Sequence, residues 1–404
     1  MQRTIFLVDM NAFYITCEMS RRPELWNQPA AVAGDPSKRT GIILAANYPA
    51  RSLGVKTAMT VKEALRLCPG LVCVPPDHAF YSEKSKAFML KLSDYSPLVE
   101  QNSIDEAWLD MTGTDRIFGT PEAAAKMIMD DLQEHLSLWC SIGISENKFL
   151  SKMASDMKKP LGITTLWRKE IPEKLWPLPV NRMWGIGEKT SAKLNKFHII
   201  TIGDLAKADA RELTQRLGEN ILVLQRKAQG VDNTSLVNHG DDDMKSIGRS
   251  TTLAKDAFHI EDVRIILMSL SEDVGKRARL HHKMGTTVQI QIKLNDFTSI
   301  TRQVQLPSAT CYTQDIFDAG FALMKNHWPS RKGVRLIGIS LSQFDDTENK
   351  QISIFDLSQH NAIDKTSAHD HQKIDEVMDQ IRQKYGADKI ARASLLKPKK
   401  PPGE

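Results

Sequence analysis

Two neighbouring carboxylates, Asp105 and Glu106, stand in a stretch that otherwise alternates like a half-buried strand, SIDEAWLDM. Mutual repulsion and desolvation both oppose such a pair. Because successive side chains of an ideal strand point to opposite faces, these carboxylates can converge on one point only at a strand end or a hairpin bend. Asn102 and Ser103, just upstream, favour a bend. The pair therefore predicts a strand that begins at a turn.

The first residues of the chain supply a third acid. The stretch TIFLVDM has the pattern of a buried strand that ends at Asp9. If this strand lies beside the hairpin, three carboxylates meet, and only a cation holds them together at low cost. Oxygen ligands without nearby His or Cys favour Mg²⁺ or Mn²⁺, and paired metals about 4 Å apart are the usual device for phosphoryl or nucleotidyl transfer. The alternative is that the three acids are unrelated surface residues, as most charged residues are.

Two further segments are candidates for binding phosphate. Tyr48 and Arg51 are three residues apart, so they share one face of a helical turn, and an Arg beside a phenol can hold phosphate oxygens. In the predicted basic helix ENKFLSKMASDMKK, Lys148 and Lys152 share a face, and Lys159 follows where the helix ends. Taken alone, each group is more often a solvated surface. The phosphate-binding interpretation requires that they surround the acids.

The stretch VNRMWGIGEKTSAKL contains a Gly-x-Gly turn, Gly185 to Gly187, between two predicted short helices. Exposed backbone N–H groups at the start of the second helix form an anion site. The pattern resembles a helix-hairpin-helix, which holds a DNA backbone without reading its sequence. An ordinary turn between helices is an equally good interpretation, because glycine is common at such corners.

Strands alternate with helices up to about residue 166, which predicts an α+β sheet domain with helices on one face and the acids at strand ends. Short helices follow to about residue 240. A β-α-β-β-α-β order then begins, which is the pattern of a compact ferredoxin-like unit. Its predicted strands cover residues 246–253, 286–294, 300–306 and 334–342, and its predicted helices cover residues 260–281 and 313–327. One amphipathic helix is predicted over residues 371–386.

Charge and cysteine content limit the class of protein. The net charge is +5, and residues 246–345 carry 13 Lys and Arg against 9 Asp and Glu, so most of the positive excess lies in one segment that could meet a polyanion. No apolar run approaches the ~18 residues that span a bilayer, and we expect a cytoplasmic protein. The five cysteines are scattered, without histidines at zinc spacing, which argues against a disulfide framework or a structural metal site.

Several stretches together resemble Y-family DNA polymerases, and the chain looks like the polymerase IV branch of these translesion enzymes. The stretches that occur in the order and spacing of that family are FLVDMNAFY, AANYPARSLGVK, SIDEAWLD, SIGISENKFLSKMASDMKKPLGI and WGIGEKTSAKL. The resemblance covers residues 1–355. Asn11 differs from the acid often seen at this position in polymerase IV, and NAFY is closer to the UmuC-type branch.

The resemblance implies a multidomain α+β fold of the right-hand polymerase kind, with a ferredoxin-like palm, small fingers, a helical thumb and a β-α-β-β-α-β little finger that binds DNA. The implied boundaries are residues 1–11 and 79–166 for the palm, 12–78 for the fingers, 167–240 for the thumb with its helix-hairpin-helix, 246–345 for the little finger, and 346–404 for a tail with a clamp-binding peptide and a C-terminal helix.

The resemblance also implies roles for single residues. Asp9, Asp105 and Glu106 match the metal-binding carboxylates, with the Met10 carbonyl as a further ligand, and the implied cofactors are two Mg²⁺ ions, with Mn²⁺ as a substitute. The residues that match those holding the incoming dNTP are Tyr48, Arg51 and Lys159, and Tyr14 matches the steric gate, the ring that excludes a ribose 2′-OH. The candidate DNA-contacting residues are Gly185, Gly187, Lys189, Arg249, Arg302 and Arg335.

The implied function is template-directed addition of dNTPs to primer–template DNA with low fidelity, in translesion synthesis, by a monomer that acts at the bacterial nucleoid. Small residues such as Ala45 and Ala46 agree with a roomy site, although alanines also simply pack. Gln351, Ile354 and Phe355 match the peptide with which bacterial polymerases bind the sliding clamp. Two alternatives remain: a non-catalytic DNA-binding scaffold, which would have no use for converging carboxylates, and a nucleotidyl cyclase, which would have no use for the DNA-binding segments.

Overall fold

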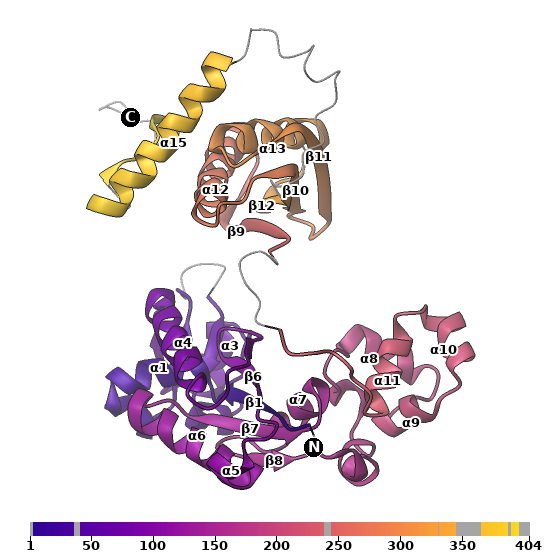
Figure 1. Cartoon of the computed structure of the whole chain (residues 1–404). Helices are drawn as coiled ribbons and strands as arrows, with labels where there is room; N and C mark the ends of the chain where they lie inside the picture. Colours follow the sequence, from indigo (N-terminus) through magenta and orange to yellow (C-terminus); the bar gives the residue numbers. More distant parts are fainter. Residues whose placement is uncertain are drawn as a thin grey trace. The chain divides into compact units, whose positions relative to one another are not determined.

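The structure is a computed structural model that describes residues 3–35, 41–237, 244–329, 331–344, 365–386 and 389–395. The chain divides into two compact units, Met1–His239 and Gly240–Glu404 (Figure 1). The described part of the first unit contains two sheets and that of the second unit one, and each unit has its own buried core.

The described part of the first unit contains a five-stranded sheet with the order β5-β6-β1-β7-β8. Strand β1 lies in the middle, pairs antiparallel with β6 and β7, and is buried along its whole length. This agrees with the apolar run that the sequence shows there. The strands are β1 (Ile5–Met10), β5 (Val99–Gln101), β6 (Glu106–Asp110), β7 (Cys140–Ser145) and β8 (Ile163–Thr165).

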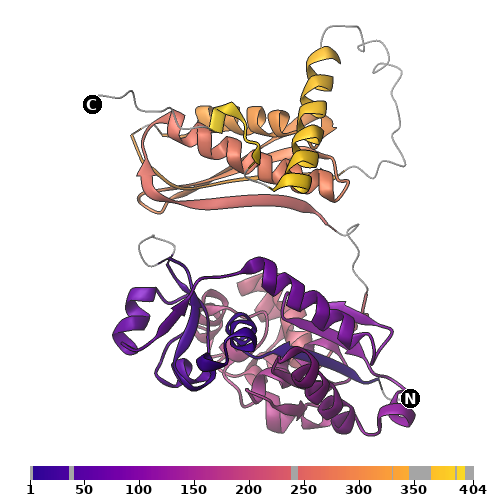
Figure 2. The same ribbon diagram turned by 90° about the vertical axis from the view of Figure 1, so that its left-hand side faces the viewer.

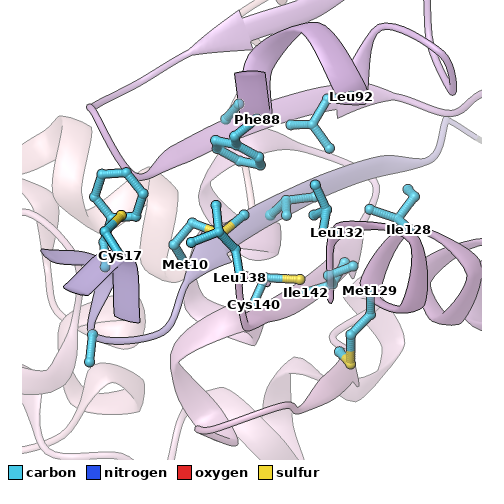
Figure 3. Close-up of a cluster of buried hydrophobic side chains, with 14 of the residues drawn as sticks. Met10, Cys17, Phe88, Leu92, Ile128, Met129, Leu132, Leu138, Cys140 and Ile142 are labelled. Atoms are coloured by element: carbon cyan, nitrogen blue, oxygen red, sulfur yellow. The ribbon is translucent and has the colours of Figure 1, made fainter. Parts of the chain in front are cut away.

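Helices α4 (His78–Leu92) and α6 (Pro121–Leu136) cover one face of this sheet. Helix α6 begins at a Thr-Pro pair: the Thr120 side chain accepts a hydrogen bond from the backbone N–H of Ala123, and proline occupies the first helical position. The core between these helices and the sheet includes Met10, Phe88, Leu92, Ile128, Leu132 and Ile142 (Figure 3). A short helix, α5 (Asp115–Phe118), precedes α6.

Helix α7 (Lys148–Met157) covers the opposite face. It lies so close to β7 that a Cβ atom on Gly143 would stand 2.0 Å from the Ser151 carbonyl oxygen. Ile142 and Ile144 point into the core under α4 and α6, so Gly143 faces the other way. The prediction that the helices lie on one face is therefore wrong. The reason is that α7 buries its apolar side chains in a second cluster, shared with the helices that follow it.

A smaller three-stranded sheet with the order β3-β2-β4 follows helix α1. A capping box begins α3: the Thr60 hydroxyl accepts from the Glu63 N–H at 3.2 Å, and the Glu63 carboxylate accepts from the Thr60 N–H at 3.0 Å. The elements are α1 (Phe13–Arg21), β2 (Ala30–Ala33), β3 (Ile43–Ala46), α2 (Tyr48–Ser52), α3 (Val61–Leu67) and β4 (Val72–Val74).

Short helices fill the chain from residue 168 to residue 228. Gly185 makes the predicted turn with φ of +94°, a left-handed value that favours glycine. The element before this turn is a single 3₁₀ turn, Val180–Arg182, and the element after it is α8 (Glu188–Asn195). The later helices are α9 (Ile202–Lys207), α10 (Ala210–Leu217) and α11 (Ile221–Ala228).

The described part of the second unit contains a four-stranded sheet with the order β11-β10-β12-β9, in which each adjacent pair is antiparallel. The predicted β-α-β-β-α-β order is confirmed. Helices α12 and α13 lie on one face of the sheet (Figure 2), and each connects two parallel strands that have one strand between them. The elements are β9 (Ser246–Ala257), α12 (Ile260–Leu280), β10 (Gly285–Leu294), β11 (Ser299–Thr310), α13 (Thr313–His327) and β12 (Val334–Phe344).

Helix α15 (Lys365–Tyr385) packs on this helical layer (Figure 1). The Arg279 guanidinium of α12 donates to Asp379 at 2.7 Å and to Asp375 at 3.0 Å, and Asp375 also accepts from the backbone N–H of Thr313 at 2.8 Å. The predicted C-terminal helix is confirmed, with an earlier start. No helix in the described ranges combines the length and the apolar character that a membrane crossing requires.

Candidate active site

One cleft of the first unit, with a volume of about 430 Å³, brings together residues from β1, α1, the β5–β6 hairpin, α2 and α7. Every residue that the sequence assigns to metal or dNTP binding lines it. These are Asp9, Met10, Tyr14, Tyr48, Arg51, Asp105, Glu106 and Lys159. Of the phosphate-binding candidates, Tyr48, Arg51, Lys152 and Lys159 line this cleft with the acids, whereas Lys148 does not.

The adjacent acids lie where the sequence places them, at a bend. Strand β5 ends at Gln101 and β6 begins at Glu106, so Asp105 is the last residue of the turn. Its carbonyl oxygen accepts from the Met10 N–H at 2.9 Å, and its carboxylate accepts from the Ser103 hydroxyl at 2.5 Å. The first bond fixes the hairpin to the end of β1, and the second holds the turn itself.

Asp9 and Glu106 are direct cross-strand partners of β1 and β6. They share the face of the sheet on which Leu7 and Trp108 lie, because the strand alternates and Val8 points into the opposite core. That face is covered by α7. The Lys152 ammonium group of α7 donates to Asp9 Oδ2 at 2.9 Å and to Glu106 Oε2 at 2.6 Å.

A second ammonium group completes this arrangement. Lys159 Nζ lies 2.9 Å from Asp9 Oδ1 and 2.8 Å from Asp156 Oδ1. Burial acts to raise the pKa of Asp9, but Lys159 and Lys152 outweigh it and hold the pKa below its ordinary value. For Glu106 burial dominates, and its pKa is raised despite Lys152. The site therefore stabilises charge on Asp9 more strongly than on Glu106.

The donor set fits a hard divalent cation. Carboxylate oxygens of Asp9, Asp105 and Glu106, with a main-chain carbonyl at Met10 on the same cleft, are the oxygen ligands that Mg²⁺ and Mn²⁺ prefer. Within the described ranges, no three His, Cys, Asp or Glu side chains are already arranged to hold a metal ion. Both Asp9 oxygens and one Glu106 oxygen instead contact lysine ammonium groups.

The phosphate-binding candidates lie across the cleft, on α2. The Arg51 guanidinium stands 5.3 Å from the centre of the Tyr48 ring, and its Nε donates to the Ala46 carbonyl at 2.8 Å. These contacts hold the Arg51 guanidinium on the same face of α2 as the Tyr48 ring, as the three-residue spacing of Tyr48 and Arg51 predicts. In the described part of the chain, the Tyr48 hydroxyl oxygen is buried and has no hydrogen-bond partner. A buried polar atom in this state is suited to a ligand's acceptor oxygen.

Tyr14 is the second residue of α1 and lines the cleft. Burial, followed by the nearby charge of Asp105, raises the pKa of its phenol, so the ring is neutral at physiological pH. Its position on the helix that follows β1 places it next to the acids. Ala45 also lines the cleft, whereas Ala46 is packed in the core of the small sheet.

The predicted DNA-contacting residues are divided between the two units. In the first unit, Gly185 and Gly187 lie at the turn before α8, and Lys189 is the second residue of α8. In the second unit, Arg249 is opposite Ile339 and Arg302 is opposite Ile290 in the sheet register. Arg335 is half-buried, with its guanidinium 4.6 Å from the Phe297 ring centre.

Cross-strand partners point to the same face of a sheet, and Ile290 and Ile339 belong to the core under the helices. Arg249 and Arg302 therefore point to the helical side, and Arg249 lies 3.4 Å from Asp273 of α12. Gln289, Gln291 and Lys293 of β10 alternate with core residues and point to the open face. A shallow depression there is lined by Gly248, Ser250, Gln289, Gln291, Gly338 and Ser340, together with Arg249 and Ile339 of the same strands.

Sequence reasoning assigned no contact between Lys152 and the acids. It also missed the supporting role of Asn11, whose side chain accepts a hydrogen bond from the Leu161 N–H and donates one to the Ser141 hydroxyl. Lys148, which shares a face with Lys152, is used elsewhere: its ammonium group lies 2.6 Å and 2.7 Å from the two Glu100 oxygens. Helical spacing places both lysines on the covered face, but only the sheet register shows which acid each one meets.

Three segments of the chain match known families. Residues 8–156 match the impB/mucB/samB family, residues 168–199 the HHH motif of the IMS family, and residues 244–354 the impB/mucB/samB family C-terminal domain.

Curated proteins match over nearly the whole chain. DNA polymerase IV of Alkaliphilus oremlandii is 55% identical over 397 residues, which are 98% of this chain and 100% of that protein. DNA polymerase IV of Clostridium kluyveri is 51% identical over 401 residues, or 99% and 100%. Among solved structures, the Y-family DNA polymerase chimera Dbh-Dpo4(243-245)-Dbh has the same fold, with a TM-score of 0.73 and 24% identity over 84% of this chain and 99% of that one.

Sequence relatives of this length and identity, together with the shared fold, make the chain a DNA-directed DNA polymerase. Within that class it belongs to the impB/mucB/samB family, the Y family of DNA polymerases. The resemblance read from the sequence is thereby confirmed, as is its α+β multidomain fold.

Proposed function

We propose that this chain extends a primer 3′-OH on a DNA template by two-metal nucleotidyl transfer, with low fidelity and past damaged bases. The observation that carries the proposal is one cleft lined by Asp9, Asp105 and Glu106 together with Tyr48, Arg51 and Lys159. Oxygen ligands for divalent ions and cationic groups for a triphosphate thus line one cavity of nucleotide scale. The relatives named DNA polymerase IV support the same reaction.

The chain's own groups supply binding and orientation. Arg51 and Lys159 present positive charge to the phosphates, and the Tyr48 hydroxyl is a donor within reach of a phosphate oxygen. Asp9, Asp105, Glu106 and the Met10 carbonyl would hold the metal ions. When bound there, such ions lower the pKa of the 3′-OH and stabilise the pyrophosphate leaving group.

The test is primer extension and gel shift with Asp105→Ala. Extension should fall by at least about 10³-fold, because metal-ion charge stabilisation is worth several kcal/mol and each 1.36 kcal/mol is tenfold in rate. DNA binding should persist. Asp110→Asn, at the other end of β6, is the matched control and should extend normally. Extension by Asp105→Ala at a rate near that of the wild type would refute the proposal.

Low fidelity is proposed from the side chains beside the substrate. Ala45 lines the cleft at 7% exposure and leaves room next to Tyr48. A roomy site cannot reject poorly shaped base pairs by steric exclusion. Primer extension with each single dNTP, on intact and lesion-bearing templates, measures this directly. Accuracy at the level of replicative enzymes on intact DNA would contradict it.

The proposed partners are primer–template DNA, dNTPs and a bacterial sliding clamp. The clamp peptide, Gln351, Ile354 and Phe355, lies outside the described residues, so this part rests on its sequence pattern alone. Replacing Ile354 and Phe355 with alanine should remove stimulation by the clamp and leave basal synthesis unchanged. Stimulation that survives the double change would rule the peptide out. The scaffold alternative is not favoured, because the relatives are polymerases and the acids converge on one cleft.

A further inference from the structure

Lys152 is a buried cation whose charge the polymerase mechanism above does not use. Its side chain is 11% exposed, on the face of α7 that covers the sheet. Its ammonium group bridges the two strands, with Asp9 Oδ2 at 2.9 Å and Glu106 Oε2 at 2.6 Å. Two buried carboxylates side by side repel each other unless positive charge lies between them. Lys152 supplies that charge from within the chain.

The same oxygens are the ones that a metal ion needs. Lys152 contacts one oxygen of Asp9 and Lys159 contacts the other. A Mg²⁺ ion bound at ~2.1 Å would stand close to an ammonium group that kept its 2.6–2.9 Å contacts with the same carboxylates. Like charges at such separation in a partly buried site repel strongly. The metal and the Lys152 ammonium group therefore compete for Asp9 and Glu106.

A second acid lies within reach of Lys152 on its own helix. Asp156, one helical turn further along α7, has its Oδ2 atom 3.7 Å from Lys152 Nζ and is 46% exposed. A change of the lysine's terminal torsions could bring the ammonium group toward Asp156 and away from Asp9 without moving the backbone. The side chain thus has two acceptors, one in the cleft and one at its rim.

We infer that Lys152 is a built-in counter-cation: it neutralises Asp9 and Glu106 before metal binds, and it leaves them for Asp156 and the substrate phosphates when metal enters. The inference rests on the proposed metal site. It makes Lys152 a positioning residue that keeps the acids together and sets the affinity of the site for divalent ions.

The first test measures Mn²⁺ binding to the full-length chain without nucleotide. The electron spin resonance signal of free Mn²⁺ gives the amount that is not bound. Lys152→Met keeps the apolar stem and removes the charge. It should bind Mn²⁺ about tenfold more tightly or better than the wild type, because the competing cation is gone. In thermal unfolding, this variant should melt below the wild type in EDTA and gain more from added Mn²⁺.

Lys148→Met is the matched control. Lys148 lies one turn earlier on α7, is similarly buried at 12% exposure, and pairs with Glu100 instead of the cleft acids. This change should lower stability and leave Mn²⁺ affinity within about twofold of wild type. If loss of the Lys148–Glu100 ion pair prevents folding, Lys148→Met with Glu100→Gln serves in its place.

The second test needs no variant. Amine-reactive labelling of the wild type, read by mass spectrometry, should modify Lys152 faster when Mn²⁺ is added, while Lys148 labelling stays constant. Equal Mn²⁺ affinity in the wild type and Lys152→Met, or labelling of Lys152 that Mn²⁺ does not change, would overturn the inference. Failure of the proposed function gives a different result. In that case Asp105→Ala and Asp9→Asn would leave Mn²⁺ binding by the chain unchanged, because the ion would not bind at these acids.

Discussion

The rings of Tyr14 and Tyr81 stack with their centres 4.6 Å apart and their planes 17° from parallel. Tyr81 is fixed from behind, since its hydroxyl donates to Glu18 at 2.8 Å, and Glu18 is fully buried and paired with Arg21 at 2.7 Å. The ring that lines the cleft therefore rests on a rigid support. A wall of this kind can exclude a substrate group by contact alone.

Tyr14→Ala should open the space that a ribose 2′-OH would fill. We expect ribonucleotide insertion to rise by about 10- to 200-fold relative to deoxynucleotide insertion, the range for a group that a pocket excludes sterically. Single-nucleotide insertion with matched rNTP and dNTP gives the ratio. Tyr14→Phe keeps the ring and should keep the discrimination. If both variants select sugars like the wild type, Tyr14 is not the gate.

Asn11 supports the turn that carries Lys159. Its side-chain oxygen accepts from the Leu161 N–H at 2.9 Å, and its amide donates to the Ser141 hydroxyl at 3.0 Å. Asn11→Ala removes the acceptor of this partly buried N–H, which costs about 0.5–1.5 kcal/mol, and it loosens the turn. We expect the KM for dNTP to rise by roughly tenfold, with a smaller change in kcat.

The rescue variant for this position is Asn11→Asp, whose carboxylate can still accept from Leu161 and from the Ser141 hydroxyl. It should restore the KM of the wild type. A purely structural role would lower stability in Asn11→Ala without changing KM, and steady-state kinetics on folded protein separates the two. Unchanged KM in Asn11→Ala would contradict the assignment.

Asp296 gives the second unit a dependence on pH. It lies 2.6 Å from Lys332, whose hydrogen bond, with those from Thr298, lowers the pKa of Asp296 from 3.8 to about 2. Because the folded-state pKa is below that of the unfolded chain, the ionised group stabilises the fold above about pH 4, and this contribution is lost as the pH falls toward 2. Asp296→Asn should lower the urea midpoint at pH 7, and its difference from wild type should shrink at pH 3. A difference that is the same at both pH values would contradict this assignment.

Local pattern was sufficient for much of the fold and the site. The caps Thr60 and Thr120 mark the starts of α3 and α6 because a cap satisfies backbone groups of its own turn. The bend at Asp105 follows from alternation, since two adjacent acids cannot share a face within a strand. Tyr48 and Arg51 meet because three residues make almost one helical turn.

Partners far apart in the sequence were beyond that reasoning. Lys148 and Lys152 are one turn apart, yet one meets Glu100 and the other meets Asp9, and only the register of β1 and β6 decides between these acids. The orientation of Arg249 likewise depends on its pairing with β12, because a shift of one residue would turn it to the open face.

Several ion pairs connect helix α15 to helix α12 of the second unit. Arg279 contacts Asp375, Asp379 and the Cys311 carbonyl oxygen at 2.7 to 3.0 Å, and Asp375 is 3% exposed. Removing one partner of a buried ion pair costs up to about 3–5 kcal/mol. Without Arg279, Asp379 loses its 2.7 Å contact and Asp375 keeps its ion pair with Arg392 alone. Arg279→Met should therefore release the helix while the sheet and its core stay folded.

Hydrogen exchange measured by mass spectrometry checks this. Amides of α15 should lose protection by about 10²-fold or more in Arg279→Met, whereas those of β10, in the centre of the sheet, should change little. Arg264→Met is the matched control, since Arg264 pairs with Glu261 on an exposed turn of the same α12, and surface pairs of this kind contribute little. If α15 exchanges equally in Arg279→Met and the wild type, the ion pairs do not hold it, and apolar contacts such as Met378, at 7% exposure, carry the attachment instead.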